Sequence, residues 1–599
     1  MKRNNKYIKL LLSCISVIVL ISGCKKGLDY PNNGVISPEM VWSDPKMIKA
    51  YLNDIYGKSM PGWVFNGHDS DEAINAPKNF GNYLRGIISE TGTNAGLNYE
   101  IIDKANFFLD ELANVPATVL PVELKSQYVG EAKFWRAWSY WGMVNRVGGI
   151  PLILHKQDFN DVPGLFKSRN KTSECITQIV KDLDDAILSL PGVYANAGAD
   201  YGRITKVAAM AMKGRVLLTY ASPLFNPTND PARWEVAYNA CKAAVDFGAT
   251  QGHDLHPRFH TIWTDERNKE VVMVNQFFYP GHANNFGELR PGAENNNQPL
   301  LSLLLAFPKR DGSPMQFDKN QLIDPAYNTQ FMTDFYNNRD DRFFSTIYCG
   351  GTPQPTPEEQ APGYIKGMSF WSIWNENEPG KYVNIAQKIH PGYSGNMGCT
   401  GFFQRKGIDT TVNTVDRFKA QTDWVEMRYA ELLMNYGECA NEFGKSTEAL
   451  EVLKRIRKRA GITAGIDGNY GIVATSQVDL REAFIKERQV EFAFENQRFN
   501  DLRRLKRYDI MNNQVGRHGL YITVKDMNNL PGPYEKITSA VTRTKLTARY
   551  IDNLDGDAAY KFNLDLNHWF YALQPSQISQ SKNVLLQNKE WGGTFDPLQ

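Results

Sequence analysis

The sequence predicts a mainly α-helical protein: four tetratricopeptide-like helix pairs form a scaffold that carries a large loop-rich mixed α/β insert and a loop-rich tail. One observation is a helical spacing of apolar residues, such as Ile176, Ile179 and Leu183, which places them on one face of a helix. Another is the pair Gly437 and Ala449, small residues at the spacing of a tetratricopeptide hairpin whose helices cross closely. One such hairpin cannot bury its own apolar face, so a stack of them is expected.

The N-terminal half of the chain is expected to hold six helices. Their boundaries come from residues that start and stop helices. Thr205 is a typical N-cap, Pro231 a typical first-turn proline, and the Gly148-Gly149 pair a typical stop. The expected ranges are 45–56, 99–113, 123–147, 172–190, 205–220 and 231–247.

A second group of helices is expected after residue 422. Asp423 followed by Glu426 has the form of a helix start, so a helix is expected over 423–440, and a second one follows the break at Gly444. A third, highly charged helix is expected over 479–506.

The segment between residues 248 and 422 has little helical periodicity. Short strands are expected at 271–274 and 346–349, and the remainder is rich in Gly, Pro, Asn and aromatic residues. A structureless loop of this length is unusual inside a compact domain, so we interpret the segment as a mixed subdomain set into the scaffold.

Residues 1–23 have the form of a lipoprotein signal peptide. Basic residues precede an apolar segment, 10–21, that is shorter than the ~20 residues needed to span a bilayer. The segment Ser22-Gly23-Cys24 matches a bacterial lipobox, in which cleavage after Gly23 leaves Cys24 as the lipidated first residue. An ordinary signal peptide with a cysteine near its cleavage site is the alternative.

The mature chain is expected to divide into five parts. A flexible leash covers 24–40, and the N-terminal helical scaffold with loop insertions covers 41–250. The loop-rich insert subdomain covers 251–422, the C-terminal helical scaffold 423–508 and the loop-rich tail 509–599.

Charge and cysteine usage limit the classes of function. The 67 basic and 65 acidic residues nearly balance and form no basic tail, so no nucleic-acid partner is expected. Five cysteines remain in the mature chain beyond Cys24, and none forms a CxxC pair. Three of them lie on apolar helix faces and are expected to be buried, whereas Cys349 and Cys399 lie in loops and could pair; the three are Cys175, Cys241 and Cys439.

Three clusters of polar residues are candidate sites of catalysis or metal binding. Glu487, Glu491 and Glu495 share one face of the charged helix, and ion pairs that hold helices in register are favoured over acid–base catalysis. The three histidines at 253, 256 and 260 have a spacing that suits zinc, but a proline among them favours a plain loop. The aspartates at 552, 555 and 557 are a weak signal for a structural calcium ion. The sequence has no enzyme motif, and no cofactor is expected.

Aromatic and polar residues in the loops are the better candidates for ligand binding. Aromatic residues make up 12% of the chain, more than a helical scaffold needs. Trp and Tyr rings can stack on the apolar faces of sugars, while Asp and Arg side chains bond the hydroxyl groups. For any single ring, a place in the core of the insert is the alternative. The candidates are Trp63, Asp69, Asp71, Arg85, Trp263, Phe278, Tyr279, Trp371 and Trp374.

The segment 487–504, with the sequence ERQVEFAFENQRFNDLRR, is the most telling of an ordered set of segments. Together these segments resemble the SusD/RagB family, surface lipoproteins of Bacteroidota nutrient-uptake systems. Asn496 stands where the family usually has Gly, and the basic pair Lys25-Lys26 stands where surface-export signals are usually acidic. Other matching segments are 27–31, 36–42, 70–73, 131–137, 146–152, 206–220, 338–343, 428–433 and 587–591.

The resemblance implies four tetratricopeptide-like units and a non-enzymatic role. It implies a protein that is anchored by lipid to the outer membrane, faces the cell exterior and passes a glycan to a SusC-like TonB-dependent transporter. A peptide- or glycopeptide-binding lipoprotein of the RagB type is one alternative. A tetratricopeptide-like scaffold for protein partners is another. A surface hydrolase is disfavoured by the missing enzyme motifs.

Overall fold

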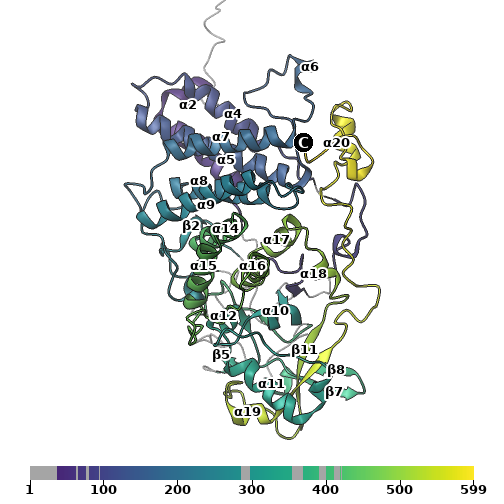
Figure 1. The fold of residues 1–599 in the computed structure, drawn as a ribbon. Helices are drawn as coiled ribbons and strands as arrows, with labels where there is room; N and C mark the ends of the chain where they lie inside the picture. The colour runs from purple at the N-terminus through teal and green to yellow at the C-terminus, as the bar shows by residue number, and fades with distance from the viewer. Residues whose placement is uncertain are drawn as a thin grey trace, which may run out of the picture.

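The computed structural model describes residues 37–62, 65–75, 80–93, 95–284, 297–353, 368–389, 399–410, 419 and 421–599. The predicted signal peptide, Cys24 and most of the predicted leash lie outside these residues. In Figure 1 the N-terminal helices form one end of the molecule, a second group of helices lies in the middle, and small sheets with short helices form the other end.

The N-terminal helices pack one upon the next. Contacts run from α4 to α5, then to α7, α8 and α9 in sequence order. Local signals fix their starts: the Thr205 hydroxyl accepts a hydrogen bond from the Ala208 N–H, and Asp44 and Asp230 cap helices whose first residue is proline. The helices are α2 (Pro38–Ser43), α3 (Pro45–Ser59), α4 (Glu100–Ala113), α5 (Val122–Val147), α6 (Val162–Leu165), α7 (Thr172–Ser189), α8 (Lys206–Ala221) and α9 (Pro231–Thr250).

The second group of helices continues this stack. Its members are α14 (Tyr429–Glu442), α15 (Ser446–Arg459), α16 (Gln477–Glu491), α17 (Arg498–Arg504) and α18 (Asp509–Asn512). Helix α14 packs against α9, α15 and α16, and one large apolar core extends from α3 to α16. Gly437 lies where α14 passes close to α15 and α16, because a Cβ atom there would be 2.7 Å from the Phe484 ring and 2.9 Å from the Val452 Cβ. The predicted mainly helical fold is confirmed.

Two predicted helix boundaries were wrong. Residues Trp424–Arg428 form strand β10, which pairs antiparallel with β2 (Val271–Asn275), and helix α14 begins only at Tyr429. Strand β2 provides hydrogen-bond partners for the backbone of this largely buried segment. This pairing overrides the local capping signal. The charged helix is also interrupted, because Phe494 and Asn496 have φ angles of 66° and 59°, in the left-handed region that ends a helix.

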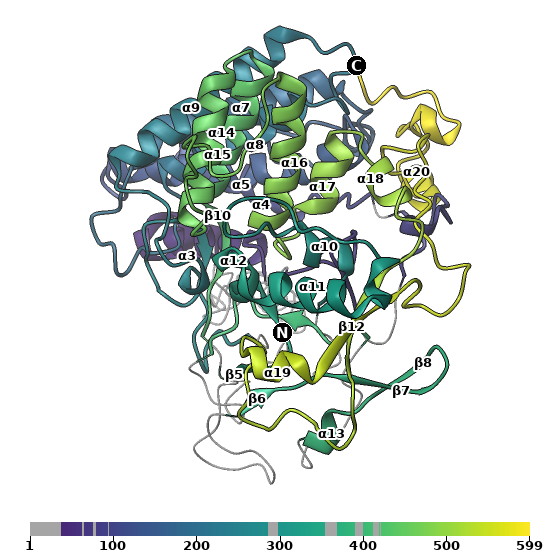
Figure 2. The same cartoon turned by 60° about the horizontal axis from the view of Figure 1, so that its bottom comes forward.

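The lower end in Figure 1 combines parts of the insert with the part of the tail that holds β11 and α19. Strands β11 (Gly519–Val524) and β12 (Leu546–Ile551) form a hairpin, and β7 (Trp374–Glu378) with β8 (Lys381–Asn384) extends it to a sheet of order β12-β11-β7-β8. The β7–β8 hairpin projects from the edge of the molecule (Figure 2). The division of the chain into the five parts given above stays a prediction.

Short elements fill the rest of this end. The predicted strands at 271–274 and 346–349 are confirmed as β2 and β4, but helix α11 was not expected. The strands are β1 (Ala73–Ile74), β3 (Gln298–Pro299), β4 (Ile347–Tyr348), β5 (Thr352–Pro353), β6 (Ser369–Phe370) and β9 (Phe403–Gln404). The helices are η1 (Tyr83–Arg85), η2 (Phe259–Thr261), α10 (Leu301–Ala306), η4 (Gln321–Ile323), α11 (Pro325–Asn337), α12 (Asp341–Thr346), α13 (Ala386–Ile389), α19 (Ala540–Thr544), α20 (Pro575–Gln580) and η6 (Lys589–Trp591). Within the described ranges, none of the helices is long and apolar enough to cross a membrane.

Candidate ligand-binding site

The three glutamates of the charged segment form buried ion pairs. Arg342 from α12 lies 2.8 Å from Glu487 and 3.0 Å from Glu491, and Arg428 at the end of β10 lies 2.6 Å from Glu491 and 2.9 Å from Glu495. Burial alone would raise the pKa of Glu491, but the surrounding guanidinium groups hold that pKa well below its usual value. The interpretation as ion pairs that hold several elements in register is confirmed.

In the histidine and aspartate clusters, the side chains of His256, Asp552 and Asp555 interact with other side chains of the protein. His256 is buried, with its Nε2 2.9 Å from Asp265 Oδ2. Asp555 forms an ion pair with Arg517, and Asp552 lies 3.7 Å from Lys319. Over the described part of the chain, no group of three or more His, Cys, Asp or Glu side chains is placed to hold a metal ion.

The five cysteines that the structure describes are all buried. Burial of Cys175, Cys241 and Cys439 was expected. The pairing of Cys349 with Cys399, which the sequence left open, does not occur, because no disulfide bond joins these two residues.

Several candidate ligand residues lie in the core. Trp263 is 2% exposed, Trp371 fully buried and Trp374 7% exposed, and the Trp374 ring stacks on Tyr521 with the ring centres 3.9 Å apart. These rings therefore have no open face for a ligand in this conformation.

The polar candidates near the N-terminus are spread apart. Asp71 is buried and lies 2.9 Å from Arg498, so an ion pair inside the protein compensates its charge. Arg85 lies over the Tyr560 ring at 4.4 Å. Asp69 is exposed and accepts a hydrogen bond from Asn66. Trp63 lies outside the described residues.

Phe278 and Tyr279 stand apart from the other candidates because they are exposed, at 56% and 49%. They lie on a tight turn that we call the aromatic hairpin, residues 276–284. The backbones of Phe278 and His282 exchange two hydrogen bonds of 2.8 Å across it. The rings of Phe277 and His282 stack at 4.4 Å beneath the turn. The hairpin thus presents two large rings to solvent on a fixed base.

Asp423 fixes this base to the scaffold. Its Oδ1 accepts a hydrogen bond of 2.8 Å from the Phe277 N–H, and the Asn284 amide donates to the Thr422 carbonyl. Burial raises the pKa of Asp423 to about 6, and the nearby Glu266 carboxylate adds to the rise. Among the described residues, nothing donates a hydrogen bond to its buried Oδ2. Sequence reasoning missed Asp423, since it assigned the side chain to a helix cap.

The chain on either side of Trp63 also approaches the hairpin. The Pro61 carbonyl accepts a hydrogen bond of 2.8 Å from the Asn275 amide, one residue before the hairpin. The Phe65 ring lies 5.8 Å from the Trp263 ring and 4.9 Å from the Trp424 ring. Segments that are far apart in the sequence therefore meet at the base of the hairpin.

Comparison with known families identifies the chain. A family model described as "SusD family" matches residues 261–591, and a second, described as "Starch-binding associating with outer membrane", matches residues 85–218. This chain belongs to the SusD family. The resemblance drawn from the sequence motifs is confirmed.

Relatives of this SusD-family protein match it over most of their length. SusD-like protein P25 of Formosa agariphila is 22% identical over 529 residues, which cover 83% of this chain and 88% of the relative. A SusD-like protein from Bacteroides fragilis has the same fold, with a TM-score of 0.65, 22% identity, and coverage of 92% of this chain and 98% of that one. A structure named as a SusD-like carbohydrate binding protein, also from Bacteroides fragilis, matches with a TM-score of 0.65 and 18% identity over 91% of this chain and 99% of that one.

Proposed function

We propose that this SusD-family protein captures oligosaccharides or polysaccharides at the outer membrane and passes them to a SusC-like TonB-dependent transporter. It acts by binding and not by catalysis. Lipid on Cys24 anchors it, and the body faces the cell exterior. Family membership and the carbohydrate-binding name of a protein with the same fold support the choice of a glycan.

The exposed aromatic hairpin is the observation that carries this proposal. Large apolar side chains are normally buried, so Phe278 and Tyr279 leave apolar surface in contact with water. Sugar rings present apolar C–H faces that stack on such rings, and stacking removes both surfaces from water. The contacts of Phe277 with His282 and Asp423 hold the hairpin in place before a ligand arrives.

The ion-pair network supports a binding role over a catalytic one. A general acid or base needs a proton that it can exchange with a substrate near neutral pH. Glu491 is fully buried, and its pKa is held well below the usual range by Arg459, Arg428 and Arg342 although burial alone would raise it. This carboxylate stabilises the scaffold.

A binding screen with the purified full-length protein tests the proposed function. The probes are a panel of oligosaccharides and polysaccharides and a pool of peptides, and the readouts are Trp fluorescence and calorimetry. We expect saturable binding of at least one glycan, and loss of that binding in Phe278→Ala/Tyr279→Ala. Binding of peptides alone would point to a peptide-binding protein of the RagB type. Binding of neither would favour a scaffold for protein partners.

Co-purification of a TonB-dependent transporter from native membranes tests the partner separately.

A further inference from the structure

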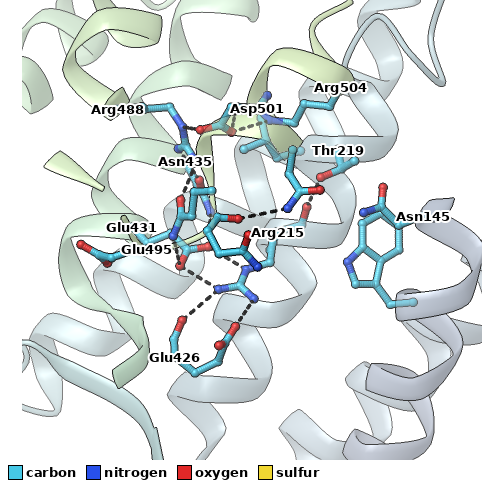
Figure 3. Close-up of a pocket in the computed structure, with 15 residues that line it drawn as sticks. Asn145, Arg215, Thr219, Glu426, Glu431, Asn435, Arg488, Glu495, Asp501 and Arg504 are labelled. Carbon is cyan, nitrogen blue, oxygen red and sulfur yellow. Dashed lines mark hydrogen bonds and ion pairs between the residues drawn. The ribbon is translucent and has the colours of Figure 1, made fainter. Parts of the chain in front are cut away.

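A concave site lies within the helical stack and shares no residue with the aromatic hairpin. Figure 3 shows this polar cleft, which has a volume of about 200 Å³. Helix α5 contributes Trp141 and Asn145 to one side. Helices α8, α14 and α16, strand β10 and the link into α17 contribute charged and amide side chains to the others, and Asn145 faces the charged groups across the cleft.

The charges that line the polar cleft are compensated within the protein. Arg215 lies 2.9 Å from Glu426 and 2.7 Å from Glu431. Asp501 lies 2.7 Å from Arg488 and 2.9 Å from Arg504. A charged ligand would have to break one of these pairs and leave a buried charge without its partner, which is costly. The lining therefore disfavours anions and cations and suits a neutral molecule.

The mouth of the cleft carries amide groups with unused hydrogen-bonding capacity. The side-chain amides of Asn145 and Asn496 have no hydrogen-bond partner among the described residues. The Asn500 amide donates to the Asn496 carbonyl, which leaves its own oxygen as an acceptor. Amides both donate and accept, as neighbouring hydroxyl groups on a sugar require. Trp141 also belongs to the lining, but it is only 8% exposed and forms part of the buried wall.

The backbone holds these groups in fixed positions. Asn496 has a φ of 59°, a conformation that Asn adopts more readily than most residues. The preceding residue, Glu495, is held by ion pairs of 2.9 Å with Arg428 and 2.8 Å with Lys406. Side chains placed by such a rigid turn lose little conformational freedom when they bind a ligand.

We propose that the polar cleft binds one neutral sugar unit, as a second carbohydrate subsite beside the aromatic hairpin. The hydroxyl groups bond the amides of Asn145, Asn496 and Asn500. This inference rests on the proposed glycan function and adds to it a site that prefers small, uncharged sugars.

Titration of small sugars into the full-length protein tests this subsite. The protein is kept in a detergent without a sugar headgroup. The probes are glucose, galactose, mannose, xylose and maltose, and saturation-transfer NMR detects their binding. Glucuronate and glucosamine serve as charged analogues. We expect at least one neutral sugar to bind, and both charged analogues to bind about tenfold more weakly or worse, because every lining charge already has a partner.

Variants locate the binding. Asn145→Ala/Asn500→Ala is expected to weaken binding of the neutral sugar about tenfold or more, at an unchanged melting temperature. Asn377→Ala, an exposed amide on β7, is the matched control and should bind like the wild type. The subsite is refuted if the wild type binds no neutral sugar, or if the double variant binds sugars as tightly as the wild type.

The same experiment separates the subsite from the proposed function. If polysaccharide binds and depends on Phe278 and Tyr279, while the sugar binding ignores Asn145 and Asn500, only the subsite is wrong. If the wild type binds no glycan of any length, both are wrong.

Discussion

Arg428 Nη1 lies 2.6 Å from Glu491 Oε1, and both side chains are buried. Arg428 also lies 2.7 Å from Glu270 and 2.9 Å from Glu495, so one guanidinium group joins three carboxylates from different parts of the chain. These contacts link strand β10 to the end of α16 and to the residue before β2. The pair is a junction between the helical stack and the insert.

Removing this junction should destabilise the protein strongly. Arg428→Met removes one positive charge from a buried cluster in which Glu270, Glu491 and Glu495 keep only their other partners, Arg459, Arg342 and Lys406. The uncompensated buried charge typically costs about 3–5 kcal/mol of unfolding free energy. Urea unfolding measures the loss. Lys242→Met is the control, because it breaks an exposed pair of 2.6 Å with Asp246 and should cost at most about 0.5 kcal/mol. Equal losses in the two variants would contradict the role of the junction.

The close packing at Gly437 gives a second prediction. An added Cβ would lie 2.7 Å from the Phe484 ring and 2.9 Å from Val452, so Gly437→Ala should destabilise by about 1–3 kcal/mol through overpacking. Gly57→Ala on α3 meets no atom within 4 Å and should stabilise the helix by up to about 1 kcal/mol. Thermal unfolding that ranks the two variants in the opposite order would show that the helices do not cross here as described.

Trp371 and Phe278 should respond in opposite ways to truncation. Trp371 is fully buried, so Trp371→Ala should cost about 3–5 kcal/mol of stability. Phe278 is 56% exposed, so Phe278→Ala should change stability by less than about 0.5 kcal/mol. Urea unfolding of both variants checks this. A large loss of stability in Phe278→Ala would mean that the ring belongs to the core.

Asp423 gives the stability of the protein a dependence on pH. Burial raises its pKa from 3.8 to about 6, so the folded state favours the neutral carboxyl group. Its stabilising contribution is complete below pH 3.8 and is lost as pH rises through about 6. Relative to Asp423→Asn, which cannot titrate here, the wild type should lose about 1–2 kcal/mol between pH 4 and pH 7. Parallel stability curves for the two proteins would rule out the raised pKa.

Helical periodicity was enough to predict the stack, because helices such as α7 and α15 bury one apolar face against their neighbours. It could not predict β10, since the strand exists only because β2 lies beside it. The break at Phe494 and Asn496 was missed for a similar reason: ion pairs and packing from other elements hold a backbone that the local sequence does not demand. The departure at Asn496 from the usual Gly was a usable signal, as both residues tolerate a positive φ.

The candidate site was only partly predictable. Composition selected the aromatic residues, but a Trp in a core and a Tyr on a surface have similar sequence neighbours. Burial separates Trp371 from Tyr279, and burial depends on contacts between distant segments. Asp423 carries only a helix-cap signal and Asn145 carries no motif, so only the fold brings them to a site.

The most direct test of the glycan-binding role is calorimetry of the wild type and Phe278→Ala/Tyr279→Ala with the tightest glycan from the screen. The double variant should keep the melting temperature of the wild type and bind at least about tenfold more weakly, because the stacking surface is gone. If it binds the glycan with wild-type affinity, the aromatic hairpin is not the capture site, and the central claim is wrong.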